Sequence, residues 1–215
     1  MKKTLNDIRS AENPIPLNKQ IINTVSILFI GIALGTFSKF LDTTPTNELP
    51  FIFEFLDMSN FLGRFAIWLL VALCISIYSN SSIRASINVF VFFVGMVTSY
   101  YLYSRFAAGF FPGSYAMIWA AFTVISPILA FICWYAKGKS KPAFMLSTII
   151  LAVLFNTAFV YGSSYFEMRS ILELITFICA VVFLKRKTIK DTMSMFIFSV
   201  GVAFALDFAV PFHFG

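Results

Sequence analysis

Seven apolar stretches, each long enough to cross a lipid bilayer, occupy most of this 215-residue sequence. A hydrocarbon core about 30 Å thick needs roughly 20 apolar residues per helix, so seven crossings leave little chain for a water-soluble domain. Hydrophobic residues make up 59% of the sequence and charged residues 12%, whereas a soluble domain needs a largely polar surface. The sequence therefore predicts an all-α, polytopic integral membrane bundle. The expected spans are 20–41, 61–79, 85–104, 114–136, 142–162, 169–185 and 190–210.

The connections between these spans are short and carry Pro, Gly, Asn, Ser or charged residues, which interrupt helices. Only the first connection, 42–60, is long, and its stretch 51–57 is either a lid over a pocket or a plain interfacial segment. The run 169–185 is the shortest, and a re-entrant segment is the alternative to a full crossing. We expect a cytoplasmic N-terminal segment, 1–19, followed by a single transmembrane domain, 20–215.

The basic residues predict the orientation of the chain. Cytoplasmic ends of membrane helices collect Lys and Arg, and with seven spans twelve of the 16 Lys and Arg residues fall on the side of the N-terminus. This pattern predicts that the N-terminus lies in the cytoplasm and the C-terminus outside the cell. The expected location of the protein is the cell membrane. Because the basic residues form short clusters between apolar runs, the net charge of +6 does not indicate nucleic-acid binding.

Ionisable residues near the predicted outer ends of the spans form the candidate site, since such residues usually face a bundle interior or a water-filled cavity. Arg64 would open a helix and Asp207 would close one, each against the local helix dipole. We therefore expect an ion pair between Arg64 and Asp207, or a ligand that they share. Arg169 and Glu173, four residues apart, would form an intrahelical pair or face the ligand. The candidate ligand-binding residues are Arg64, Asp207, Lys39, Arg105, Glu173, Asn156, Trp68 and Trp119.

Smaller motifs add little chemistry. Gly31 and Gly35 form a GxxxG motif, which allows close helix packing either within the bundle or against a partner subunit. Pro127 falls in the middle of a predicted span and should kink it or free a backbone carbonyl. The three cysteines are expected to be small buried apolar residues. Zinc-protease, serine-hydrolase and Walker A motifs are absent, so the sequence predicts no cofactor and no metal.

In its size and compactness, in the Gly31–Gly35 motif of the first span and in the long loop after it, the chain resembles the S components of energy-coupling-factor vitamin transporters. The resemblance rests on size and layout only. It implies the capture of a small-molecule ligand on the outer side of the membrane.

Three functions are compatible with the sequence. The leading hypothesis is a membrane protein that binds a small solute in an outward-facing polar pocket, as a transporter or substrate-capture subunit. The second is an intramembrane enzyme acting on lipid-linked or peptide substrates, with Glu173 or Asp207 as general base. The third is a non-catalytic interaction or regulatory protein whose outer charges only fix helix packing. The lipid bilayer is the expected partner in all three.

Overall fold

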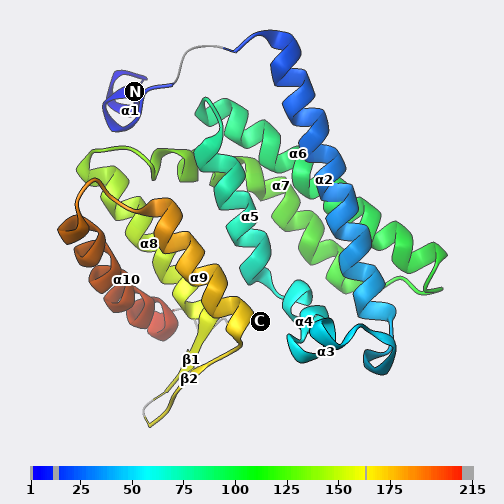
Figure 1. Cartoon of the computed structure of the whole chain (residues 1–215). Helices are drawn as coiled ribbons and strands as arrows, with labels where there is room; N and C mark the ends of the chain where they lie inside the picture. The colour runs from blue at the N-terminus through cyan, green and yellow to red at the C-terminus, as the bar shows by residue number, and fades with distance from the viewer. Residues whose placement is uncertain (1, 12–14, 163, 210–215) are drawn as a thin grey trace.

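The computed structural model describes residues 2–11, 15–162 and 164–209, and these are mostly helical (Figure 1). The predicted end of the last span, at residue 210, lies outside the described residues. The elements, in chain order, are α1 (Lys2–Ile8), α2 (Leu17–Thr43), η1 (Thr46–Glu48), α3 (Phe51–Phe55), α4 (Met58–Gly63), α5 (Phe65–Tyr78), α6 (Ser82–Phe106), α7 (Gly113–Tyr135), α8 (Lys141–Ala158), β1 (Phe159–Tyr161), β2 (Phe166–Met168), α9 (Ile171–Leu184) and α10 (Ile189–Ala209).

Five of the described helices, α2, α6, α7, α8 and α10, are long and apolar enough to cross a membrane. The chain is thus an all-α protein with the helices of a membrane-embedded bundle, as its composition predicts. Two more apolar helices, α5 and α9, have 14 residues each, which corresponds to about 21 Å at 1.5 Å per residue. Both are shorter than the expected spans 61–79 and 169–185.

The helices form two groups with α5 between them. In the first group α2 packs along α6, and α6 packs against α7; in the second, α8 contacts both α9 and α10 (Figure 1). Helix α5 contacts α6 and α7 on one side and α8 and α9 on the other. The residues buried between these helices are mostly apolar and form separate clusters, and α5 contributes to two of them, with Leu70 and Leu73 in one and Trp68 in the other.

The GxxxG motif packs inside the chain. Gly31 and Gly35 are buried, and a methyl group added to either would collide with the backbone of α6, at Phe92 or Met96. Gly95 on α6 meets the backbone of α2 at Leu28 in the same way. Small residues on both helices therefore allow the close α2–α6 approach, and this face of α2 is covered by the chain itself.

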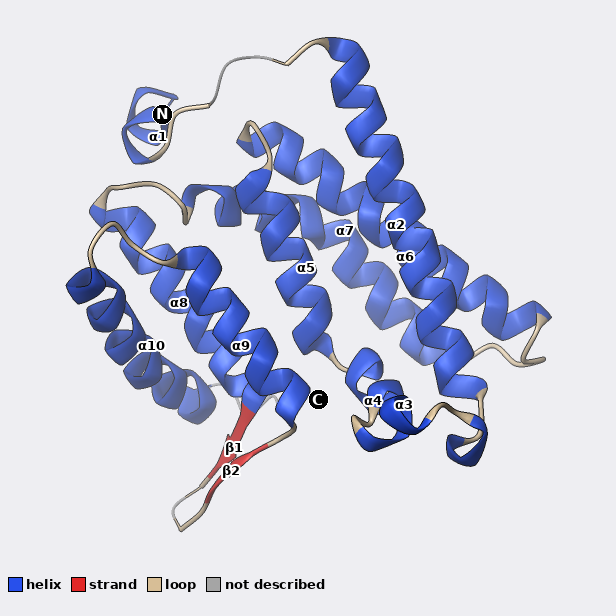
Figure 2. Cartoon of the chain, in the orientation of Figure 1, coloured by secondary structure: helices blue, strands red, loops and turns tan. Residues whose placement is uncertain are grey.

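A short β-hairpin replaces the end of the predicted fifth span. Helix α8 ends at Ala158, and Phe159, Val160 and Tyr161 pair antiparallel with Met168, Glu167 and Phe166. Figure 2 shows the hairpin projecting beyond the helices. The expected helix to residue 162 was wrong at this end because aromatic and β-branched residues also suit a strand. We call this side of the bundle, which also holds α3 and α4, the hairpin end.

The opposite side is the basic end, where α5, α7 and α9 finish. Arg9 donates to the carbonyl oxygens of Trp134 and Ile77, at 2.7 and 3.0 Å, and Lys137 donates to that of Phe183. These carbonyls lie in the last turns of α7, α5 and α9, where the helix dipole favours cations. Burial lowers the pKa of Lys137, and the charges of neighbouring Arg186, Lys185 and Arg9 lower it further. Arg9 and Lys137 therefore also bind carbonyl groups at the C-terminal ends of helices.

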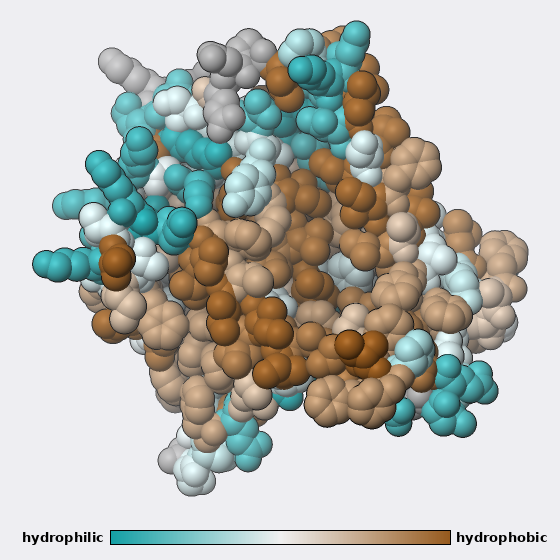
Figure 3. Space-filling model, in the orientation of Figure 1, coloured by the Kyte–Doolittle hydropathy of each residue, from teal (hydrophilic) through white to brown (hydrophobic). Residues whose placement is uncertain are grey.

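The outer surface is apolar across the middle of the bundle. Figure 3 shows a broad hydrophobic area on one face, with hydrophilic residues gathered near α1 at the basic end and in smaller groups at the hairpin end. Large apolar side chains on the outward faces of α2, α7 and α10 are exposed, including those of Phe29, Val124 and Phe198. Such a surface is suited to lipid as the surrounding solvent.

Candidate functional site

An ion pair links α5 to α9 at the hairpin end. The Nη1 atom of Arg64 donates to Oε1 of Glu173 at 2.9 Å. The Glu173 side chain is fully buried, whereas the Arg64 side chain is 28% exposed. The second carboxylate oxygen of Glu173, Oε2, is buried and has no hydrogen-bond partner among the described residues. A buried carboxylate needs such partners, so Oε2 is an acceptor that the described residues leave unsatisfied.

Local structure places both members of this pair. Arg64 lies at a break between α4 and α5, in extended conformation with φ −96° and ψ 166°, so the predicted single helix over 61–79 is interrupted. Glu173 lies in the first turn of α9, where Ser170 caps the helix by accepting from the Glu173 backbone N–H. The dipole at this turn favours the carboxylate. The carboxylate in turn compensates the Arg64 charge, which stands against the dipole of α5.

The expected ion pair between Arg64 and Asp207 does not occur among the described residues, whereas a ligand shared by the two stays a prediction. The structure pairs Arg64 with Glu173 instead. Arg169 precedes α9, which begins at Ile171, so Arg169 and Glu173 are not one turn apart on a single helix. Arg169 is held instead by its backbone N–H, which donates to the carbonyl oxygen of Ala158.

Lys39 belongs to a second polar cluster, between α2 and α6. Its side chain is buried; the ammonium group binds Oδ2 of Asp42 and lies 4.7 Å from the ring centre of Phe110 and 5.1 Å from that of Tyr100. The Tyr100 hydroxyl donates to the same Asp42 oxygen at 3.2 Å. A carboxylate and two aromatic faces thus satisfy the buried cation.

The two predicted tryptophans lie between these clusters. Trp68 is buried and donates from Nε1 to the carbonyl oxygen of Leu62 at 2.8 Å. Trp119 stacks on Phe65, the residue after Arg64, with ring centres 4.9 Å apart. With Ser38 and Tyr100 they line a cavity of about 30 Å³. That volume holds one or two water molecules.

The remaining predicted residues are elsewhere. Asn156 donates to the carbonyl oxygen of Ala203 on α10 and accepts from the Tyr161 hydroxyl at 2.8 Å, so its hydrogen bonds hold α8, α10 and the hairpin together. Asp207 is half-buried on α10, and its charge contributes to the raised pKa of Tyr161. Arg105 is exposed in the last turn of α6. The structure therefore joins Arg64 to Glu173 but distributes the other residues over separate clusters.

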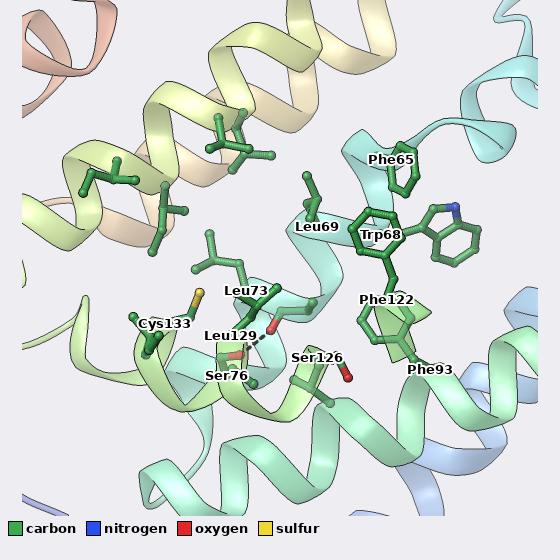
Figure 4. Close-up of a pocket in the computed structure, with 18 of the residues that line it drawn as sticks. Phe65, Trp68, Leu69, Leu73, Ser76, Phe93, Phe122, Ser126, Leu129 and Cys133 are labelled. Carbon is green, nitrogen blue, oxygen red and sulfur yellow. Dashed lines mark hydrogen bonds between the residues drawn. The ribbon is translucent and has the colours of Figure 1, made fainter. Parts of the chain in front are cut away.

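One apolar cavity was not expected from the sequence. A groove of about 300 Å³ lies between α5, α6, α7 and α8, where α7 and α8 face each other across it (Figure 4). Phe65, Trp68 and Phe122 lie at one end of the groove, and Ser76 and Cys133 lie towards the other. From Phe65 to Ser76 the groove follows α5 for about 16 Å. Its length is thus roughly half the thickness of a bilayer core.

The groove presents almost no polar groups to a ligand. Its two hydroxyl side chains are already used: Ser76 donates to the carbonyl oxygen of Ala72, and Ser126 to that of Thr123. Pro127, within α7, leaves one backbone carbonyl without its helical donor. The carbonyl oxygen of Pro127 itself accepts from Ser86 at 2.8 Å. Such a lining suits hydrocarbon, because a polar group buried there would find few partners.

A polar cleft at the basic end was also missed. It has a volume of about 290 Å³ between α2, α5 and α6. Its lining includes Asn23, Ser26, Ser79, Asn80, Arg84 and Asn88. The sequence signal is the concentration of Asn and Ser beside Arg84 at the start of α6, a composition that is also typical of a plain helix connection. Among the described residues, no group of three or more His, Cys, Asp or Glu residues could hold a metal ion.

No family model, curated protein or solved structure matches this chain.

Proposed function

We propose that the protein binds the hydrocarbon chain of a lipid or lipid-linked molecule in the groove between α5 and α7–α8. The supporting observation is the lining of the groove, which is apolar except for two serines that bond to their own helices. Because the helices around the groove are those of a membrane bundle, the hydrocarbon of the bilayer is the medium beside it. A lipid chain is therefore the occupant that fits both the lining and the surroundings.

The headgroup of such a ligand would lie near Arg64. Phe65, the next residue, lines the groove, and the one hydrogen bond of the Arg64 side chain to described residues uses Nη1. The Nη2 and Nε donors are available to an acidic headgroup, for which a guanidinium is well suited. The ligand class is accordingly an anionic amphiphile, which agrees with the lipid-linked substrates of the second hypothesis.

We further propose seven crossings of the cell membrane, with the basic end in the cytoplasm. In this arrangement α4 and the hairpin complete the short helices α5 and α9 at the outer surface. The bias of Lys and Arg towards the basic end supports this orientation. Cysteines introduced at Lys139 and Asp57, in a protein with its three native cysteines replaced, should react with an impermeant maleimide from opposite sides. Reaction of both from one side of intact cells would contradict seven crossings.

Fluorescence quenching tests ligand binding in the groove. Two of the three tryptophans, Trp68 and Trp119, line the groove, and Trp134 is buried at the basic end. The protein is reconstituted in phosphatidylcholine containing a small fraction of lipid brominated on the acyl chain. Bromine quenches tryptophan fluorescence on contact. A brominated acyl chain in the groove should therefore quench the fluorescence of the wild-type protein more than the surrounding lipid alone would.

Matched variants show whether the quenching belongs to the groove. Val153 is half-buried on α8 and lines the groove, so Val153→Phe should fill it and reduce the quenching. Val124 on α7 is 70% exposed and does not line the groove. Val124→Phe should therefore quench like the wild type. Equal quenching of all three proteins would refute the proposal.

Capture or transport of a small polar solute stays a prediction from the sequence. The small cavity beside Ser38, Trp68 and Trp119, about 30 Å³ in volume, has room for little more than water. An open polar hollow of about 550 Å³ beside Asp42 and Glu48 is the larger space for such a solute. The groove offers about ten times the volume of the small cavity. The apolar lining of the groove supports a lipid chain as its ligand.

A further inference from the structure

A guanidinium group at the basic end has unused hydrogen-bond donors. All three side-chain hydrogen bonds of Arg84 to described residues use Nη2, which donates to Gln20 O, Thr24 Oγ1 and Asn88 Oδ1. Nη1 and Nε make none, and neither is among the buried unpartnered atoms. Arg84 lines the polar cleft between α2, α5 and α6. Its free donors are therefore accessible to a ligand there.

Neighbouring polar groups hold the guanidinium in place. Asn88 is buried; its Oδ1 accepts from the Thr24 hydroxyl at 2.9 Å, and its Nδ2 donates to Ser79 Oγ at 3.2 Å. The Ser79 hydroxyl in turn donates to the carbonyl oxygen of Ile75. This chain of bonds connects α2, α6 and α5 around Arg84. Because these bonds hold Nη2 in place, the remaining Nη1 and Nε donors keep set directions, and each can donate to an anionic oxygen in a charge-assisted bond.

The charge of Arg84 has no counter-charge in the described part of the chain. Neither of the ion pairs there involves Arg84, and no acidic residue lines the cleft. The amides of Asn23 and Asn80, which make no side-chain hydrogen bond to described residues, supply further donors to the cleft. The N-terminus of α6, capped by Ser81, adds the positive end of a helix dipole. Every one of these features favours an anion.

We propose that this cleft binds a phosphate group through Arg84, with the side-chain amides of Asn23 and Asn80 as additional donors. The volume, about 290 Å³, accommodates a phosphate and several waters. Thr24, beside Arg84, is seven residues into α2, about 10 Å from its start, a depth that the headgroup region of a bilayer can reach. The phosphate comes from a lipid headgroup or from the aqueous phase. This site is separate from the groove and does not depend on the proposed function.

The test measures the thermal unfolding midpoint of the full chain in phosphatidylcholine nanodiscs. One series adds inorganic phosphate, with chloride at equal ionic strength as reference, and the other adds phosphatidylglycerol to the nanodisc. A ligand that binds the folded protein raises the midpoint. A rise with phosphatidylglycerol alone identifies a lipid headgroup as the source, and a rise with inorganic phosphate identifies the free anion. Both results support the site.

Variants then assign the effect to the cleft. Arg84→Gln should weaken the apparent affinity at least about tenfold, because a charge-assisted bond is lost. Lys139→Gln removes an exposed positive charge from the same end and should behave like the wild type. Asn80→Asp leaves the Arg84 bonds intact and brings a negative charge into the cleft, so it should abolish the rise even if Arg84→Gln fails to fold. No rise in the wild type, or an undiminished rise in Asn80→Asp, would overturn the proposal.

Discussion

Arg64 and Glu173, 109 residues apart in the sequence, form an ion pair of 2.9 Å that fastens the break between α4 and α5 to the first turn of α9. Each residue stabilises the other's position. The carboxylate compensates a cation at the start of α5, and the guanidinium compensates a carboxylate that is fully buried. The pair joins the start of α5 to the group of α8, α9 and α10, next to Phe65 at the end of the groove.

Removing one partner should destabilise the protein more than removing both. Arg64→Gln or Glu173→Gln should each lower the free energy of unfolding by about 2 kcal/mol, between the values typical of exposed and of buried pairs. The double variant Arg64→Met with Glu173→Leu should recover part of the loss, because no unpaired charge remains. Unfolding by denaturant in detergent measures these differences as a double-mutant cycle.

Asp207 provides the comparison for this cycle. Since Asp207 forms no ion pair with Arg64, Asp207→Asn should change the stability little, and its effect should add to that of Arg64→Gln. A coupling energy between positions 64 and 207 as large as that between positions 64 and 173 would support the Arg64–Asp207 ion pair expected from the sequence and contradict the Arg64–Glu173 pair.

The α2–α6 contact predicts opposite effects for two Gly→Ala substitutions. At Gly35 a methyl group would meet the backbone of Met96, so Gly35→Ala should cost about 1–3 kcal/mol through forced separation of the helices. At Gly201, in the middle of α10, a methyl group would meet nothing within 4 Å. Gly201→Ala should therefore be neutral or slightly stabilising. Thermal unfolding of both variants decides the matter, and equal losses would argue against close α2–α6 packing.

The apolar spans were predictable because length and composition alone determine them, and all five helices long enough to cross a membrane coincide with predicted runs. The helix break at Arg64 and the end of α8 at Ala158 were not. Arg64 follows Gly63 within an otherwise apolar run, and Phe159 to Tyr161 are as apolar as the helix before them. In such runs hydropathy does not distinguish a helix from a strand, and it does not reveal a break of one residue within a helix.

The candidate site was likewise predictable only in part. Ranking charges by helix dipole correctly identified Arg64 as needing a partner, but the choice of Asp207 rather than Glu173 depended on which helices are neighbours. Helix α5 contacts α9, which carries Glu173. The groove was unpredictable for the same reason, since its lining comes from four helices and no single segment carries its pattern.

The Tyr161 hydroxyl, at the hairpin end, should ionise in the alkaline range. Burial, and after it the charge of Asp207, raise the pKa of Tyr161 to about 12. An unfolded tyrosine ionises near pH 10. A folded-state pKa above the unfolded one gives a stabilising contribution that is complete below pH 10 and is lost between about pH 10 and 12.

The Tyr161→Phe variant isolates this contribution. The variant should be less stable than the wild type near neutral pH, because Asn156 loses the hydroxyl donor. The difference in unfolding midpoint should shrink as the pH rises from 10 to 12. A difference that stays constant over this range would mean that Tyr161 ionises normally in the folded protein.

Arg186 should be the most sensitive of the basic residues near the α7–α8 connection. It donates to the carbonyl oxygens of Gly138 and Ala143 and to the Ser147 hydroxyl, at 2.6–2.7 Å. Arg186→Lys keeps the charge but cannot make all three bonds, so it should cost about 2 kcal/mol. Lys139→Gln, at an exposed position in the same connection, should cost almost nothing. Equal effects of the two substitutions would contradict a stabilising role of the Arg186 hydrogen bonds.

The central claim is that the groove holds a lipid chain, and counting retained lipids tests it most directly. The protein is purified in a mild detergent and its bound lipids are counted by native mass spectrometry. The wild type and Val124→Phe should retain one more lipid per chain than Val153→Phe, while Arg84→Gln should leave the lipid in the groove unaffected. A wild type without bound lipid, or the same number in Val153→Phe as in the wild type, would contradict the account.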